Sequence, residues 1–142
     1  QVDRSCHSFS ITGKAENVAD IHREIDLFCQ QNGIPRNKGV LLAIAFEEAA
    51  LNTINHNEHV SMIDICLLLE EGSLIVRIRD DGAPFDPLAF VDDEDILQMN
   101  NIRLLERLTD QKTYTRIMNM NNTVLSIRLE AAENDGANDG TC

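Results

Sequence analysis

The chain of 142 residues is long enough for one domain with a substantial hydrophobic core, so neither disulfides nor a metal ion is needed for stability. Its formal net charge of −12, from 24 acidic and 12 basic side chains, disfavours nucleic acid and anionic lipid as partners. No apolar run approaches the roughly 18 residues of a membrane span, and no signal-peptide pattern opens the sequence. We therefore expect a cytoplasmic protein without direct membrane contact.

The four cysteines are widely spaced and form no C-x-x-C pair, which is typical of reduced thiols and of neither a zinc site nor a disulfide scaffold. The last stretch, "AAENDGANDGTC", is rich in Ala, Asn, Asp and Gly and has no periodicity. We expect residues 1–130 to form a single domain and residues 131–142 to form a flexible acidic tail.

The N-terminal part of the chain predicts one strand followed by two helices. Apolar and polar residues alternate over 6–12, as in a strand. Apolar residues then recur at helical spacing over 18–28, and Gly33 with Pro35 ends that helix. A second helix is predicted over 37–56.

The C-terminal part predicts two hairpins separated by a loop and a helix. Gly72 marks the turn of the first hairpin, and Asn residues mark the turn of the second. The predicted elements are strands over 60–69 and 73–81, a loop over 82–100, a helix over 102–108 and strands over 113–118 and 123–129. The whole order predicts an α+β fold, a two-layer sandwich of a mixed, mostly antiparallel sheet with helices on one face.

A line of polar residues runs along the second predicted helix. Glu48, Asn52 and His56 are four residues apart, so each is offset from the last by only roughly 40° around the axis. They therefore share one face, and we expect that face to coincide with an apolar stripe made of Leu41, Ile44, Ala45 and Leu51. An alternative is that Glu48 and Asn52 cap a neighbouring loop or form hydrogen bonds with each other.

A second polar feature ends the strand predicted over 73–81. Strict alternation of inward residues up to Ile78 places Asp80, and not Asp81, on the core side. A buried carboxylate is costly unless donors reach it, and Gly82 leaves room for a flat ligand against the backbone. The alternative is an ordinary Asp-Gly turn. The two inward acids and the long loop together favour a pocket.

The two features resemble motifs of a known family. "EAALNTINH" (48–56) matches the E-A-x-x-N-x-x-x-H form of the N box, and "DDGAPFDP" (80–87) matches the D-x-G-x-P-F-D-P form of the G1 box. Both boxes are found in bacterial anti-sigma-factor serine kinases, which belong to the GHKL superfamily of histidine-kinase-like ATPases. The resemblance covers nearly the whole chain and implies a Bergerat-type fold that holds ATP between sheet and helices under a flexible lid.

The resemblance also implies roles for residues of the helix predicted over 37–56. Asn52 would coordinate Mg²⁺ that bridges the phosphates, a role suited to an amide oxygen. Glu48 would be the general base that takes the proton from an attacking serine hydroxyl. His56 would either lie near the nucleotide or close the helix.

At the other end of the implied site, the resemblance assigns the adenine contacts. Asp80 would accept a hydrogen bond from the exocyclic amino group of adenine, and Gly82 would let the base lie close to the backbone. Thr123, at the start of the last strand, would complete the contact through water.

The sequence departs from the family where relatives carry glycine. No glycine occurs between Gly82 and Gly136, and Asn101 occupies the place of a key glycine near the phosphates. Asn121 likewise replaces a common glycine. Because Asn tolerates positive φ best among the other residues, we expect left-handed backbone at both asparagines. The acidic run 92–95 falls in the implied lid and should point into solvent.

The function implied by the resemblance is that of an ATP-dependent serine kinase. It would phosphorylate an anti-sigma-factor antagonist protein, sequester a sigma factor, or do both. The alternatives are a non-catalytic protein-interaction module with a degenerate nucleotide site and a regulatory ATPase domain of a larger protein. We further expect that the chain can form a homodimer.

Overall fold

The computed structural model describes residues 4–89 and 96–129. The predicted tail 131–142 and the acidic run 92–95 lie outside the described residues. The elements in chain order are β1 (Arg4–Thr12), the short 3-10 helix η1 (Ala15–Asn17), α1 (Ala19–Gln31), α2 (Arg36–His56), β2 (Met62–Glu70), β3 (Ser73–Asp80), α3 (Ile96–Leu108), β4 (Thr109–Ile117) and β5 (Met120–Arg128).

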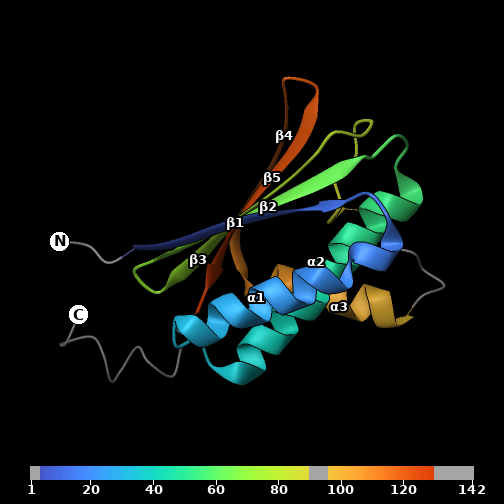
Figure 1. Ribbon diagram of the computed structural model, residues 1–142. Helices are drawn as coiled ribbons and strands as arrows, with labels where there is room; N and C mark the ends of the chain where they lie inside the picture. The colour runs from blue at the N-terminus through green and yellow to red at the C-terminus, as the bar shows by residue number, and fades with distance from the viewer. Residues whose placement is uncertain (1–3, 90–95, 130–142) are drawn as a thin grey trace.

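The strands form one sheet in the order β1-β2-β3-β5-β4, and α1, α2 and α3 lie on one side of it (Figure 1). The predicted α+β sandwich is therefore confirmed. The sheet was expected to be mixed, but every pairing among the described strands is antiparallel. The connection from β3 through α3 leads to β4, and β5 then inserts antiparallel between those two strands. This connection therefore produces no parallel pair of adjacent strands among the described strands.

Both hairpins turn through two residues with positive φ. Glu71 and Gly72 have φ of 49° and 81°, and Met118 and Asn119 have φ of 52° and 63°. Such pairs match the right-handed twist of the flanking strands. The turn predicted at Gly72 is confirmed. The left-handed backbone expected at Asn121 is wrong, because the turn is complete at Asn119 and Asn121 already pairs within β5.

Helix α2 packs along the middle of the helical layer, in contact with both α1 and α3. Its buried side chains include Leu42, Phe46 and Ala49, which face the core. Leu41, expected in the same stripe, is 37% exposed. Because neighbours cover several sides of α2, its burial does not follow a single stripe, and small Ala residues fill the close contacts.

The core fills the space between the sheet and the helices. Cys29 of α1 belongs to it, and burial raises the pKa of this thiol to about 11, so that the thiolate is disfavoured. Cys6 and Cys66 are also free thiols. Across the residues that the structure describes, no helix is both long and apolar enough to cross a membrane.

Helix α3 and strand β4 are longer than the sequence pattern predicted. Helix α3 begins at Ile96, and β4 begins at Thr109 directly after the helix ends. Strand β4 is the edge strand next to β5, and most of its side chains are exposed. An edge strand of this kind has little apolar alternation, which explains why its first residues were not predicted.

Candidate nucleotide-binding site

The inward acid predicted at the end of β3 is present. Asp80 is 1% exposed, whereas its neighbour Asp81 is half-buried. The Asp81 carboxylate accepts hydrogen bonds from the backbone N–H groups of Ser61 and Met62 at 2.9 and 3.2 Å. The two adjacent carboxylates therefore lie in different surroundings, as strand alternation predicted.

The Asp80 carboxylate is held by donors from three parts of the chain. Its Oδ1 accepts from the Gly82 N–H at 2.9 Å, from Asn121 Nδ2 at 2.9 Å and from Asn57 Nδ2 at 3.5 Å. Each hydrogen bond that described residues donate to this carboxylate ends on Oδ1. Oδ2 thus remains available to a donor from outside the described chain.

Burial raises the pKa of Asp80 above its ordinary value. The hydrogen bonds from Asn121 and Gly82 lower the pKa, Asp81 raises it, and Arg116 lowers it, so burial prevails over these partners. Perturbed carboxyl groups of this kind are common at functional sites. The carboxylate is costly to keep ionised here, and the surrounding donors reduce that cost.

Thr123 supplies a second polar atom without a partner. It is 0% exposed, and its Oγ1 has no hydrogen-bond partner among the described residues. In the β3–β5 register Asp80 pairs with Asn121 and Ile78 pairs with Thr123, so Asp80 and Thr123 lie on the same, helical side of the sheet. A buried hydroxyl normally finds a partner. An unpaired hydroxyl beside an available carboxylate oxygen fits the amino edge of a purine with a bridging water.

Gly82 is required by the packing of the chain itself. A Cβ atom there would lie 2.5 Å from Asn57 Nδ2 and 2.6 Å from Val60 Cγ2. The Asn57 side chain after α2 also binds this loop, because its Nδ2 donates to the Ala83 carbonyl at 2.9 Å. These contacts account for the glycine without a ligand, and its contact with adenine stays a prediction.

The polar line on α2 is divided between a buried and a more open part. Asn52 is 2% exposed, and its Nδ2 donates to the Pro87 carbonyl at 3.3 Å. Glu48 is half-buried, and its Oε1 accepts from Asn101 Nδ2 at 3.4 Å. His56 is the last residue of α2 and is exposed. The structure thus brings together Glu48 and Asn101, and it joins Asn52 to the loop that follows Asp80.

The left-handed turn expected at Asn101 is wrong. Asn101 lies inside α3, which begins at Ile96, and it is not among the described residues with positive φ. The helix starts earlier than its apolar pattern suggested, so the residue has helical backbone. Its side-chain amide contacts Glu48.

The donor set around α2 fits magnesium held mainly by phosphates. Among the described residues no group of three or more His, Cys, Asp or Glu side chains could hold a metal ion. Mg²⁺ commonly takes one or two protein oxygens together with substrate phosphates and water. Asn52 offers one amide oxygen of this kind, and phosphates and water would supply the remaining ligands.

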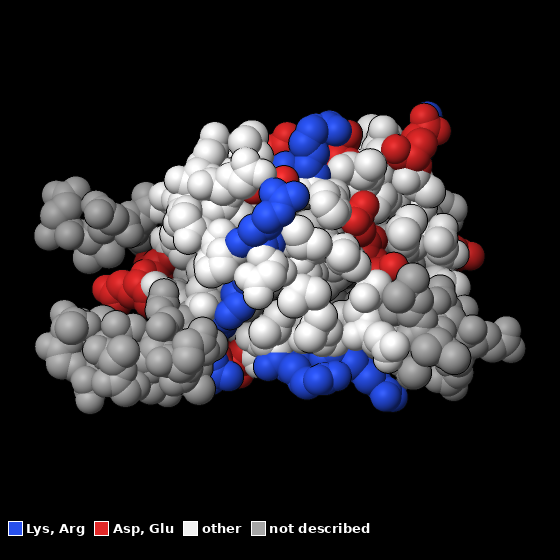
Figure 2. Space-filling model, turned by 90° about the horizontal axis from the view of Figure 1, so that it is seen from below, with Lys and Arg blue, Asp and Glu red and all other residues white. Residues whose placement is uncertain are grey.

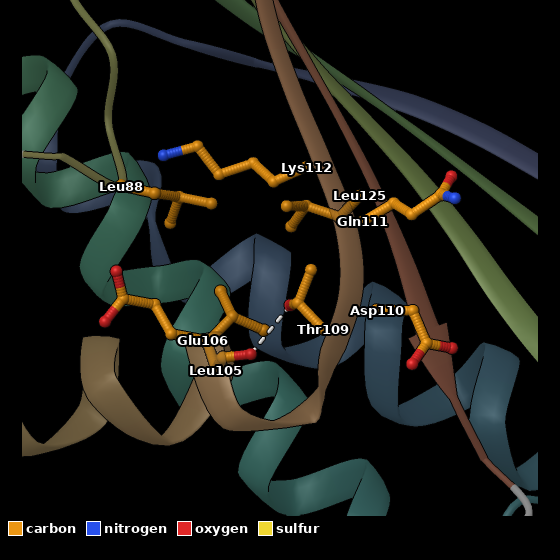
Figure 3. A pocket seen from close by; sticks show the side chains of 8 residues that line it. All are labelled: Leu88, Leu105, Glu106, Thr109, Asp110, Gln111, Lys112 and Leu125. Carbon is orange, nitrogen blue, oxygen red and sulfur yellow. Dashed lines mark hydrogen bonds between the residues drawn. The ribbon is translucent and has the colours of Figure 1, made fainter.

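A separate cavity of about 240 Å³ opens between α3 and β4 (Figure 3). Leu88, Leu105 and Leu125 line it together with polar residues of α3 and β4. Next to it, Lys112 Nζ lies 3.0 Å from Asp86 Oδ2 and ties β4 to the loop after β3. The cavity lining includes neither Asp80 nor the polar line of α2, so this cavity is distinct from the candidate site.

Sequence patterns missed the residues that hold Asp80 in place. Asn57 and Arg116 were not singled out, and Asn121 was assigned to a turn. Strand periodicity was the available signal for Asn121, because residues 121, 123 and 125 alternate inward along β5. No comparable signal marks Asn57, which follows α2 directly and reaches Asp80 only through the tertiary fold.

The family model of the histidine kinase-like ATPase domain matches residues 11–129, from the end of β1 to just beyond β5. This match spans most of the chain and all the site residues discussed above, and the chain belongs to this family. The family is part of the GHKL superfamily, whose domains generally bind ATP with Mg²⁺. Among the curated proteins no match is found.

Proposed function

We propose that this protein binds ATP with Mg²⁺ and transfers the γ-phosphoryl group to a serine of a partner protein, as a kinase of the anti-sigma-factor type. The proposal rests above all on two buried side chains, Asp80 and Thr123. Thr123 Oγ1 has no hydrogen-bond partner among the described residues, and the hydrogen bonds that these residues donate to Asp80 all end on Oδ1. Family membership and the two sequence motifs support the same reading.

At the adenine end, Asp80 Oδ2 accepts the hydrogen bond of the exocyclic amino group. Thr123 Oγ1 and a water molecule bind the neighbouring ring nitrogen. The ionised carboxylate is the stronger acceptor. Burial disfavours this form, and the donors on Oδ1 offset part of that cost. Gly82 allows the loop to follow the base closely without a side chain in between.

At the phosphate end, Asn52 would hold Mg²⁺ through its amide oxygen, and the ion would neutralise phosphate charge. Glu48 accepts the proton of the serine hydroxyl while the serine oxygen bonds to the γ-phosphorus. The bond from the γ-phosphorus to the bridging oxygen breaks, and ADP leaves with that oxygen. The Asn101 amide contacts Glu48 Oε1 and helps to orient the carboxylate.

The partners that we propose are a small antagonist protein as phosphoryl acceptor and a sigma factor as the protein held in the alternative state. A second copy of the chain is a further partner in this proposal. Seen from the helical side, Lys and Arg side chains form a band across a mostly uncharged surface (Figure 2). Exposed basic residues of the helices include Arg23, Arg36, Arg103 and Arg107. Such a band would favour an acidic face on the partner.

A non-catalytic interaction module is the second candidate. The observation that favours it is the burial of Asn52, whose amide is bonded to the Pro87 carbonyl. In this alternative Asn52 is a structural residue, because its Nδ2 already joins α2 to the loop after β3. In this alternative a partner protein binds, but no phosphoryl transfer follows.

Calorimetric titration with ATP and Mg²⁺ tests the proposal. We expect the parent protein to bind, and we expect Asp80→Asn to weaken binding about 10- to 100-fold, because a hydrogen bond to a charged group is lost. Asp64→Asn is the control, since Asp64 lies in β2 on the opposite face of the sheet and pairs with Arg79. No heat with the parent protein would reject ATP binding. Binding without transfer to any antagonist would favour the second candidate.

A further inference from the structure

The side chain of Asn121 makes hydrogen bonds through both atoms of its amide group. It is 1% exposed, lies in β5 and is the register partner of Asp80 across the β3–β5 pair. Its Nδ2 donates to Asp80 Oδ1 at 2.9 Å and to the Ala83 carbonyl at 2.7 Å. The amide therefore joins the end of β3 to the loop that follows it.

The oxygen of the same amide accepts hydrogen bonds from the loop and from β4. Asn121 Oδ1 accepts from the Phe85 N–H at 3.1 Å, from Arg116 Nη1 at 3.0 Å and from the Tyr114 hydroxyl. A flipped amide would point its NH₂ group at three donors and its oxygen at two acceptors. These partners therefore determine the orientation of the amide, and Nδ2 faces Asp80.

This orientation decides which oxygen of Asp80 is left for a ligand. The bonds from Asn121 and Gly82 both end on Oδ1 and restrain rotation of the carboxylate. Arg116 adds a second restraint, since its Nη1 also donates to the Gly82 carbonyl at 2.9 Å. Oδ2 is then directed away from the donors of the chain.

We infer that Asn121 is the positioning residue for adenine selectivity: its amide fixes Asp80 so that Oδ2 accepts the exocyclic amino group of the base. The inference rests on the proposed function, because it concerns the same site. Asn121 does not touch the nucleotide in this arrangement. It acts through Asp80, with Arg116 and Tyr114 holding its oxygen.

The test compares two nucleotides that differ only in the amino group. MgATP and the Mg²⁺ complex of purine riboside triphosphate, which lacks the 6-amino group, are titrated against the parent and Asn121→Ala. We expect Asn121→Ala to weaken ATP binding about 10-fold and binding of the amino-free nucleotide less than about threefold. Asn122→Ala is the matched control, because Asn122 is adjacent in β5 but points to the other face of the sheet. It should change neither affinity.

A variant with a smaller perturbation keeps the test decisive if Asn121→Ala does not fold. Arg116 is exposed on the edge strand β4, and Arg116→Ala removes one donor to Asn121 and one to Gly82. We expect it to lower the preference for ATP over the amino-free nucleotide about threefold. A preference equal to that of the parent would contradict the inference in this variant.

The outcomes separate the inference from the proposed function. If the parent prefers ATP, and Asp80→Asn abolishes this preference while Asn121→Ala keeps it, the proposed function stands and the inference is wrong. Tighter ATP binding by Asn121→Ala would also overturn the inference, because the amide would then obstruct the base. If the parent binds neither nucleotide, the proposed function fails and the inference fails with it.

Discussion

The two ends of the candidate site differ in how the chain holds them. At the adenine end, Asp80 and Asn121 face each other across two hydrogen-bonded strands, and several donors fix each side chain. At the phosphate end, Glu48 and Asn101 come from two helices and share one hydrogen bond of 3.4 Å. Sheet register dictates the first arrangement. The second depends on how α3 packs against α2.

This difference suggests a division of tasks. A rigid, buried end suits recognition of an unchanging base, because preorganised acceptors lose little entropy on binding. The carboxylate of Glu48 is half-buried, which suits proton transfer, in which donor and acceptor must adjust to an incoming hydroxyl. Substitutions at the two ends should therefore separate binding from chemistry.

The largest expected effect is at the phosphate end. Glu48→Gln keeps the shape of the side chain but removes the base, and we expect phosphoryl transfer to an antagonist protein to fall about 10²- to 10⁴-fold. The affinity for ATP should stay within about threefold of the parent. Transfer of label from ATP to the antagonist measures the first quantity, and calorimetry measures the second.

Glu47→Gln is the matched control for that experiment. Glu47 is the neighbour of Glu48 but pairs with His22 of α1, with Oε1 3.0 Å from His22 Nδ1. We expect this variant to transfer phosphate like the parent. Equal losses in both variants would point to a disturbed helix, and undiminished transfer by Glu48→Gln would remove Glu48 from the mechanism.

The second effect concerns the rigidity of the adenine end. Gly82→Ala forces a Cβ atom against Asn57 and Val60, at 2.5 and 2.6 Å in the present arrangement. We expect the free energy of unfolding to fall by about 1–3 kcal/mol, as in other overpacked sites, and ATP binding to weaken as Asn57 shifts. Urea unfolding and calorimetry measure the two effects.

Gly33→Ala separates general instability from damage to the site. A Cβ atom at Gly33 meets nothing within 4 Å, but the positive φ of 71° makes the residue strained. We expect a loss of stability of about 1 kcal/mol with ATP affinity unchanged. If Gly82→Ala behaves in the same way, the packing of Gly82 has no bearing on the nucleotide.

The third effect is a dependence of stability on pH. Burial raises the pKa of Asp80 in the folded state, so between its unfolded and folded pKa values the folded protein binds more protons than the unfolded chain. The contribution of Asp80 to stability is therefore fully present below the unfolded pKa and is lost as pH rises through the folded pKa. At neutral pH, Asp80→Asn should unfold at a higher urea concentration than the parent.

The difference between the two proteins should shrink as the pH is lowered through the folded pKa of Asp80. The charged groups acting on this carboxylate are Arg116 from β4 and Asp81 beside it, and both are present in each protein. Urea unfolding at several pH values measures the difference. A difference that grows toward low pH would mean that hydrogen bonding, and not burial, dominates the pKa of Asp80.

The comparison of the two ends also explains what could be predicted from the sequence. The inward position of Asp80 followed from strand alternation, which has a period of two and fixes a side chain to one face. The hairpin turn at Gly72 followed from local turn chemistry. The fold class followed from the order of such elements. In each case the determinant is local in sequence.

The errors arose where tertiary contacts decide. Asn101 and Asn121 were both assigned to left-handed turns by analogy with glycines, yet one is helical and the other is in a strand. Leu41 was assigned to the core because one face of α2 was assumed to be buried. The convergence of Asn57 and Asn121 on Asp80 joins residues 23 and 41 positions away, a distance that no periodic pattern covers.

The smallest expected effect tests the finding that Asn101 is helical and does not form a left-handed turn. Asn101→Gly restores the residue expected from the family but places glycine inside α3, where it should lower stability by roughly 0.5–1 kcal/mol. Because Asn101 contributes a single long hydrogen bond to Glu48, we expect ATP affinity to change less than about threefold.

Asn100→Gly, at an exposed neighbouring position of the same helix, is the control and should lower stability by a similar amount. If Asn101→Gly instead tightened ATP binding well beyond that range while Asn100→Gly did not, position 101 would limit access to the phosphates, and the phosphate end would be the more tightly constrained of the two.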